Sequence, residues 1–193
     1  MAGHSRYTAV LDACVLYPVA VADSLLSVAA TGLFAAKWTR KIEEEWINAL
    51  ERDRPDLKGK LSYRCDQMRV AVPDWEIPFA AWSPLVPALE LPDADDRHVL
   101  AAAIVGHADC VVTSNIKHFP NEVLERYSLH AIHPDDFLVN QWDLDELHVI
   151  AAFKGMRNRW KKPQATPDDF VRAMERNGLV ATANRLRAAI ELI

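Results

Sequence analysis

Three short apolar runs, separated by longer stretches with helical spacing, constrain the fold of this chain most strongly. The runs are 7–13 (YTAVLDA), 109–113 (DCVVT) and 129–132 (LHAI). Runs this short and this apolar are typical of strands that are buried on both faces of a parallel sheet. Because parallel strands need long crossover connections, the alternation predicts an α/β fold with a mostly parallel sheet and helices on both faces.

The segments between and after these runs are expected to be helical. Their predicted positions are 22–36, a helix capped by Thr39, a helix ending near Val70, a helix capped by Asp93, and a helix that begins at Pro134. Beyond Gln141 no strand pattern remains, and 143–160 and 166–193 have helical patterns. We therefore expect an α/β domain over 1–140 and a helical C-terminal extension over 141–193.

Composition and charge argue against several classes of protein. The chain has 193 residues, a formal net charge of −5 and three cysteines, none at the Cys-x-x-Cys spacing of zinc sites. The negative charge argues against a general nucleic-acid coat protein. No run approaches the roughly 20 apolar residues that span a bilayer. The first ten residues lack the pattern of a signal peptide, so we expect a cytoplasmic protein without a membrane partner.

Polar side chains mark the ends of the predicted strands. Asp12 ends the first strand, which places it at the carboxyl edge of the sheet, where open α/β sheets bind ligands. Ser114 and Asn115 form a polar turn after the second strand. Asp96 lies in the first turn of a predicted helix, about 40° from Leu100, so it is expected to point toward the buried face. An acid in that position needs a partner.

Three consecutive glutamates follow the Thr39 cap. Glu44 lies almost opposite the apolar stripe of this helix and is expected to face solvent, whereas Glu43 and Glu45 flank the stripe. Helical geometry does not decide between these two. A solvated acidic face is the simpler interpretation of such a triplet.

Four sequence blocks occur in a characteristic order: VLDACVLYP, WTRKIEEEW, LPDADDRHVLAAA and VVTSNIKHFP. In this order they resemble the PIN-domain nucleases, and within them the VapC-type toxins of bacterial toxin–antitoxin pairs. The resemblance extends over residues 8–138. It implies a PIN-like three-layer α/β/α sandwich with a cluster of acids at the carboxyl edge of its parallel sheet, which holds Mg²⁺ or Mn²⁺ for RNA cleavage.

When the family's motif positions are carried over to this sequence, the acids are Asp12, Glu45 and Asp96. The resemblance therefore favours Glu45 over Glu43. Asn115 takes the fourth catalytic place, and Thr113 matches a hydroxyl near the site. Asn115 stands where the family often has Asp, and its missing charge is expected to weaken a second metal. Cys14 stands where members commonly have Asn or Ser, so a polar contact beside Asp12 is expected to be missing.

The chemistry of these residue types agrees with a metal site. Two carboxylates about 4 Å apart repel by about 4 kcal/mol at an effective dielectric constant of 20, so a cluster of three needs a cation. Oxygen ligands without a cluster of His or Cys favour Mg²⁺ or Mn²⁺. We expect Asp12 and Asp96 to be direct ligands, Glu45 to be a ligand or to hold water, and Asn115 to orient either.

Cationic side chains beside the four blocks are candidate contacts for RNA phosphates. They are Arg40, Lys41, Arg97, Lys117 and His118. For each of them an ordinary surface charge is an equally good interpretation. His98 and His118 are also candidates for a general acid.

These observations predict a Mg²⁺-dependent endoribonuclease that acts as the toxin of a type II toxin–antitoxin system. The predicted partners are an RNA substrate, a cognate antitoxin protein and a second copy of the chain. Two alternatives remain open at this point. One is an RNA-processing PIN nuclease without an antitoxin, and the other is a non-cleaving PIN-like module for binding or dimerisation.

Overall fold

Four short parallel strands form the sheet, in the order β2-β1-β3-β4. They are β1 (Thr8–Leu11), β2 (Ala35–Lys37), β3 (Cys110–Val112) and β4 (His130–Ile132). In this computed structural model, which describes residues 6–161 and 164–193, all three strand pairs are parallel. The predicted parallel α/β fold is therefore confirmed, and each of the three apolar runs contains a strand.

The expected helix over 22–36 is wrong at its C-terminal end. Helix α2 covers only Val19–Ala29, and the chain then turns through Gly32, whose φ of +88° favours glycine. The residues that follow pair with β1 as the edge strand β2. Alanines such as Ala35 and Ala36 are strong helix formers, so local preference does not indicate this strand, which exists through its hydrogen bonds to β1.

The helices of the first part of the chain are short. They are α1 (Ala13–Leu16), α3 (Arg40–Asp53), α4 (Ser62–Ala71), α5 (Phe79–Trp82), α6 (Arg97–Val105), α7 (Asn121–Leu124) and α8 (Pro134–Leu144). Five 3₁₀ turns join them: η1 (Pro55–Leu57), η2 (Ser83–Ala88), η3 (Ala94–Asp96), η4 (Ile116–His118) and η5 (Glu125–Tyr127). The Thr39 hydroxyl caps α3 by accepting a hydrogen bond from the Ile42 amide, as predicted.

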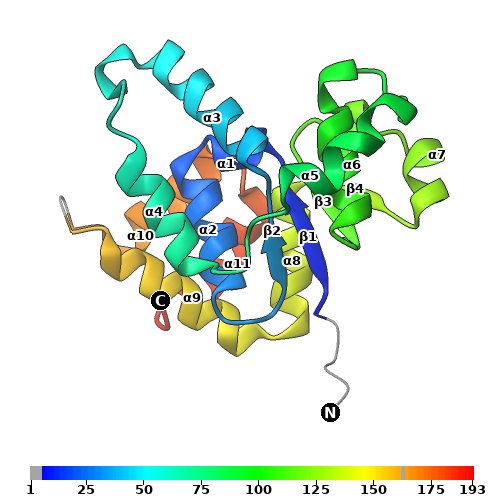
Figure 1. Cartoon of the computed structure of the whole chain (residues 1–193). Helices are drawn as coiled ribbons and strands as arrows, with labels where there is room; N and C mark the ends of the chain where they lie inside the picture. Colours follow the sequence, from blue (N-terminus) through cyan, green and yellow to red (C-terminus); the bar gives the residue numbers. More distant parts are fainter. Residues whose placement is uncertain (1–5, 162–163) are drawn as a thin grey trace.

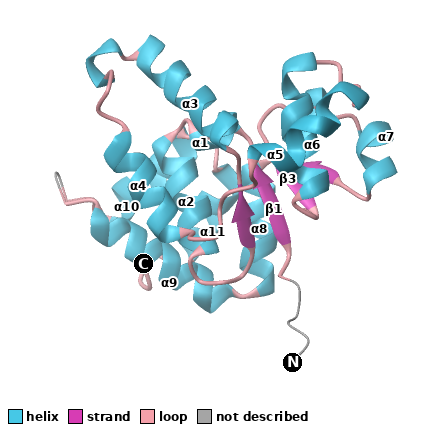
Figure 2. Ribbon diagram, in the orientation of Figure 1, coloured by secondary structure: helices cyan, strands magenta, loops and turns pink. Residues whose placement is uncertain are grey.

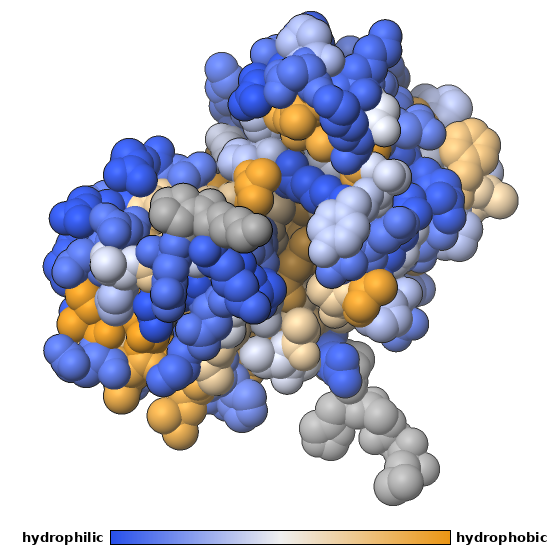
Figure 3. Space-filling model, turned by 90° about the vertical axis from the view of Figure 1, so that its left-hand side faces the viewer, coloured by the Kyte–Doolittle hydropathy of each residue, from blue (hydrophilic) through white to orange (hydrophobic). Residues whose placement is uncertain are grey.

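Helices cover the sheet from both sides (Figures 1 and 2). In Figure 1, α2 and α4 lie to the left of the strands, and α6 and α7 lie to the right. Among the largest fully buried side chains are Trp38, Trp46, Phe34 and Phe137. The face seen in Figure 3 is mostly hydrophilic, with apolar side chains in small patches.

The C-terminal part is helical, as expected, and packs directly on the α/β part. Its helices are α9 (Glu146–Arg159), α10 (Pro167–Arg176) and α11 (Val180–Ala188). The predicted single helix over 166–193 is interrupted at Gly178, whose φ is +82°. Helices α9 and α10 contact α2, and α11 contacts α8. The predicted division at 140/141 falls within α8, and it stays a prediction.

Among the described residues no helix combines the length and apolar character that crossing a bilayer requires.

Candidate functional site

Asp12 directly follows β1 and lies at the carboxyl edge of the sheet. Its backbone is extended, with ψ of 157°, and its side chain caps the short helix α1 by accepting a hydrogen bond from the Ala13 amide at 2.6 Å. The other carboxylate oxygen accepts a hydrogen bond from the Thr113 hydroxyl at 2.7 Å. Because β1 and β3 are adjacent and parallel, their ends bring these two residues together across 101 positions of sequence. Asp12 is only 4% exposed.

Cys14 completes the surroundings of Asp12. Its thiol donates to the Asp12 carboxylate at 3.1 Å, and its sulfur accepts a hydrogen bond from the Ser114 amide at 3.2 Å. Burial, followed by the Asp12 charge, raises the pKa of Cys14 to about 12, so the thiol stays protonated and can donate. The expectation that Cys14 leaves a polar contact missing is therefore wrong, because the thiol itself supplies that contact.

Asp96 approaches the same edge from a different element. It ends the turn η3 and is the residue that precedes α6, which begins at Arg97. Its side chain is 20% exposed, with one oxygen 2.8 Å from Nδ1 of His118. Partial burial raises the pKa of Asp96, and the negative charge of Asp12 raises it further, while the hydrogen bond to His118 opposes the shift. The two carboxylates thus influence each other electrostatically.

Asp93 joins Asp96 and His118 in a cluster that sequence reasoning missed. Ligand atoms of the three side chains all lie within 4.8 Å of one another. The sequence indicated only a cap for Asp93, and the carboxylate does accept a hydrogen bond from the Asp95 amide. The Asp-x-x-Asp spacing in this turn is the signal that could have revealed the second acid. The pairing with His118 depends on η4, which follows β3.

The three glutamates of α3 have different surroundings. Glu43 is buried, forms an ion pair with Arg69 of α4 and lies 3.5 Å from the indole nitrogen of Trp38. Glu44 is exposed, as predicted. Glu45 faces α6, where its Oε1 lies 2.8 Å from Nε2 of His98. Since Glu43 already has a cationic partner, this arrangement favours Glu45 as the candidate ligand.

The predicted contacts for a substrate differ in how accessible they are. Lys117 is exposed on η4, and His118 is half-buried against Asp96. Arg40 is exposed, but its guanidinium forms two hydrogen bonds to Glu76, at 2.8 and 3.0 Å. Thr113 has no exposed surface, so its hydroxyl holds Asp12 instead of presenting a surface to a substrate.

Asn115 lies at the turn after β3, near the hydroxyl that holds Asp12. Its backbone amide donates to the Thr113 hydroxyl at 3.0 Å, and its side chain is half-buried. The structure therefore connects Asp12, Thr113 and Asn115 through hydrogen bonds.

The donor set fits a hard divalent cation. The available ligand atoms are carboxylate oxygens, with one imidazole nitrogen beside them, and Mg²⁺ and Mn²⁺ prefer oxygen ligands. Burial raises the pKa of Asp96, and the charges of Asp12 and Asp93 raise it further, so a bound cation would favour the charged form of this carboxylate. Among the described residues Asp93, Asp96 and His118 could hold such an ion together, and Asp12 lies near enough for its charge to raise the pKa of Asp96.

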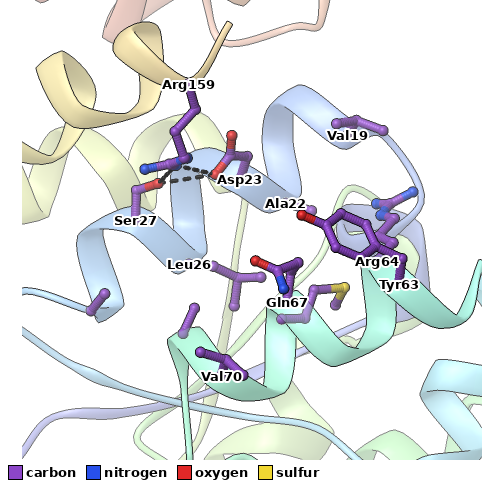
Figure 4. Close-up of a pocket in the computed structure, with 13 residues that line it drawn as sticks. Val19, Ala22, Asp23, Leu26, Ser27, Tyr63, Arg64, Gln67, Val70 and Arg159 are labelled. Atoms are coloured by element: carbon purple, nitrogen blue, oxygen red, sulfur yellow. Dashed lines mark hydrogen bonds and ion pairs between the residues drawn. The ribbon is translucent and has the colours of Figure 1, made fainter.

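A hollow of about 480 Å³ lies elsewhere, between α2 and α4 (Figure 4). Its walls are mainly apolar, and Tyr63 and Val70 of α4 line it. Arg159 of α9 reaches across its rim to Asp23 and Ser27. The only carboxylate in its lining is that of Asp23, which is already paired with Arg159. The hollow therefore lacks the converging acids of the sheet edge.

Comparison with known proteins agrees with this geometry. A family model described as "PIN domain" matches residues 8–117, and one described as "VapC50 C-terminal domain" matches residues 134–188. A Mycobacterium tuberculosis (strain ATCC 25618 / H37Rv) protein named "Putative ribonuclease VapC50" is 46% identical over 79 residues, which are 41% of this chain. The match spans 47% of that relative, about half of its length. No solved structure matches the chain.

Proposed function

Because this chain belongs to the PIN-domain family, with a C-terminal part that matches the VapC50 C-terminal domain, we propose that it is a metal-dependent endoribonuclease. The observation that carries this proposal is the convergence of acidic side chains on this edge of the sheet. Ligand atoms of Asp93, Asp96 and His118 lie within 4.8 Å of one another, and Asp12 is near enough for its charge to raise the pKa of Asp96. The family match and the relative's printed name support RNA as the substrate.

In the proposed mechanism Asp12 and Asp96 hold a divalent ion, with Glu45 as a further ligand or a holder of water. A bound Mg²⁺ or Mn²⁺ would supply the positive charge that activates water and stabilises charge developing on a phosphodiester. Thr113 and Cys14 fix the orientation of Asp12 by donating hydrogen bonds to it. Asn115, at the adjacent turn, orients a ligand or the attacking water.

We further propose that the nuclease acts as the toxin of a toxin–antitoxin pair. Its partners would be an RNA substrate, a cognate antitoxin protein and a second copy of the chain. The resemblance to VapC-type toxins and the match to the VapC50 C-terminal domain support this role.

Cleavage of a mixed cellular RNA pool tests the enzymatic proposal. The purified protein is assayed with Mg²⁺, with Mn²⁺ and with EDTA, beside the variants Asp96→Asn and Asp95→Asn. Loss of a metal ligand removes stabilisation of several kcal/mol, so Asp96→Asn is expected to cleave on the order of a hundredfold more slowly. Asp95 is exposed in the same turn, so Asp95→Asn is expected to cleave like the wild type. Equal rates in wild type and Asp96→Asn, or cleavage that persists in EDTA, would overturn the proposal.

A further inference from the structure

A buried histidine connects α3 with α6, the helix that begins directly after Asp96. His98 is 2% exposed, and its Nε2 lies 2.8 Å from Oε1 of Glu45. The ring of Trp82 packs beside the imidazole, with the ring centroids 5.9 Å apart. The Glu45 side chain, by contrast, is 36% exposed. His98 therefore meets the candidate ligand from its protein side and leaves the rest of that carboxylate accessible.

The second ring nitrogen indicates which form of the imidazole fits this position. Nδ1 of His98 is buried and has no hydrogen-bond partner among the described residues. The tautomer that carries a proton on Nε2 fits this arrangement, because it directs its N–H toward Oε1 of Glu45.

Glu43 and Glu45 of α3 have different partners. Glu43, two residues earlier on α3, is paired with the guanidinium of Arg69, which compensates its charge. Among the described lysines and arginines, only Lys41 lies near Glu45, with its Nζ 3.9 Å away. Both side chains are solvent-exposed, which screens the attraction. One oxygen of Glu45 is therefore held by the protein, while the rest of the carboxylate stays open to solvent.

We propose that His98 is a positioning residue for Glu45. Its buried imidazole fixes the orientation of that carboxylate beside the turn that carries Asp96, so that the charge of Glu45 remains available to a divalent ion. This inference rests on the metal site proposed above. Groups that orient a metal ligand typically affect metal affinity by about 10- to 100-fold when they are removed.

Mn²⁺ binding to the full chain, measured by isothermal titration calorimetry, tests this role. His98→Gln keeps a neutral N–H donor, whereas His98→Leu keeps apolar volume and loses the donor. We expect His98→Leu to raise the Kd for Mn²⁺ about tenfold or more, and His98→Gln to restore most of the affinity. His148→Gln is the matched control, because His148 lies 2.7 Å from Asp145 in an exposed pair outside the site.

A double-mutant cycle separates positioning from packing. In a Glu45→Gln background, His98→Leu is expected to cause no further loss of Mn²⁺ affinity, because the two residues act together. A further loss of the same size would show that His98 acts through packing, and would overturn the proposal. Wild-type affinity in His98→Leu, or equal weakness in His98→Leu and His98→Gln, would also overturn it while leaving the proposed function intact. If the wild type bound no Mn²⁺, the metal site itself and this role would both be wrong.

Discussion

At the scale of single residues, the surroundings of Asp12 fix a buried carboxylate in place. Three donors reach it: the Ala13 amide, the Thr113 hydroxyl and the Cys14 thiol. Hydrogen bonds of this kind satisfy the oxygen atoms of a polar group that burial has removed from water. A thiol in place of the family's Asn or Ser therefore preserves a donor at this position.

The cysteines allow a test of this packing through their reactivity. Burial raises the pKa of Cys110 to about 12, and burial also raises the pKa of Cys65. The thiolate is the reactive form, so at pH 8 we expect slow reaction of the native protein with a disulfide reagent such as DTNB. All three cysteines are expected to react once guanidinium unfolds the chain. Rapid reaction of the native protein would contradict the structure.

The raised pKa of Cys110 also predicts a pH dependence of stability. In the unfolded chain this thiol ionises near its ordinary pKa of 9.0, whereas in the folded chain it ionises only near 12. Above about pH 9 ionisation therefore favours the unfolded state, and the contribution of this group to stability is lost as the pH rises toward 12. Chemical denaturation of Cys110→Ala is expected to show a weaker dependence than the wild type across this range. An unchanged slope would contradict the assignment.

At the scale of elements, one carboxylate joins α8 to α11. Helix α11 has no side-chain cap of its own. The buried carboxylate of Asp135, in the first turn of α8, instead accepts hydrogen bonds from the amides of Ala181 and Thr182, at 2.7 and 2.8 Å. This contact spans about 46 residues of sequence and docks the last helix onto the helix that follows the sheet.

We predict that Asp135→Asn destabilises the protein by about 1–3 kcal/mol, because a charged cap at the positive end of a helix is lost. Urea denaturation followed by circular dichroism measures this change. Asp136→Asn is the matched control: Asp136 is exposed in the same turn of α8 and is expected to change stability little. Equal effects of the two substitutions would contradict the role of Asp135.

At the scale of the whole molecule, the C-terminal helices share a core with the α/β part. Ser24 of α2 has no exposed surface, and its hydroxyl lies 3.6 Å from the sulfur of Met156 in α9 and 3.5 Å from that of Met174 in α10. Phe153 and Phe170, which contact each other edge to face, are buried in the same region. Removing the extension would expose this apolar side of α2 to water.

Truncation after residue 140 tests whether the predicted division marks two units that fold independently. Because the cut also removes the last turn of α8 and the helices that cover α2, we expect the 1–140 fragment to aggregate or to unfold without a cooperative transition. Size-exclusion chromatography and thermal denaturation, with the full chain prepared in parallel, measure this. A monodisperse fragment with a cooperative transition would instead support an independent domain over 1–140.

Features set by neighbours in the chain were predictable from the sequence. The apolar runs identified β1, β3 and β4, and the cap at Thr39 was located correctly. Asp12 was placed at the carboxyl edge because the end of a parallel strand determines that position. Each of these features depends on the spacing of residue types over a few helical turns or strand residues. This spacing can be read directly from the sequence.

The contacts between segments that are distant in sequence were determined only by the tertiary structure. There, alanines with helical preference form β2, and the predicted helix over 166–193 is interrupted at Gly178. Glu43 pairs with Arg69, whereas Glu45 faces His98. Asp93 also lies next to His118. Helical spacing gives the direction of a side chain around its own axis, but its partner depends on which element packs there. That choice follows from burial and pairing across the whole chain, which no local pattern contains.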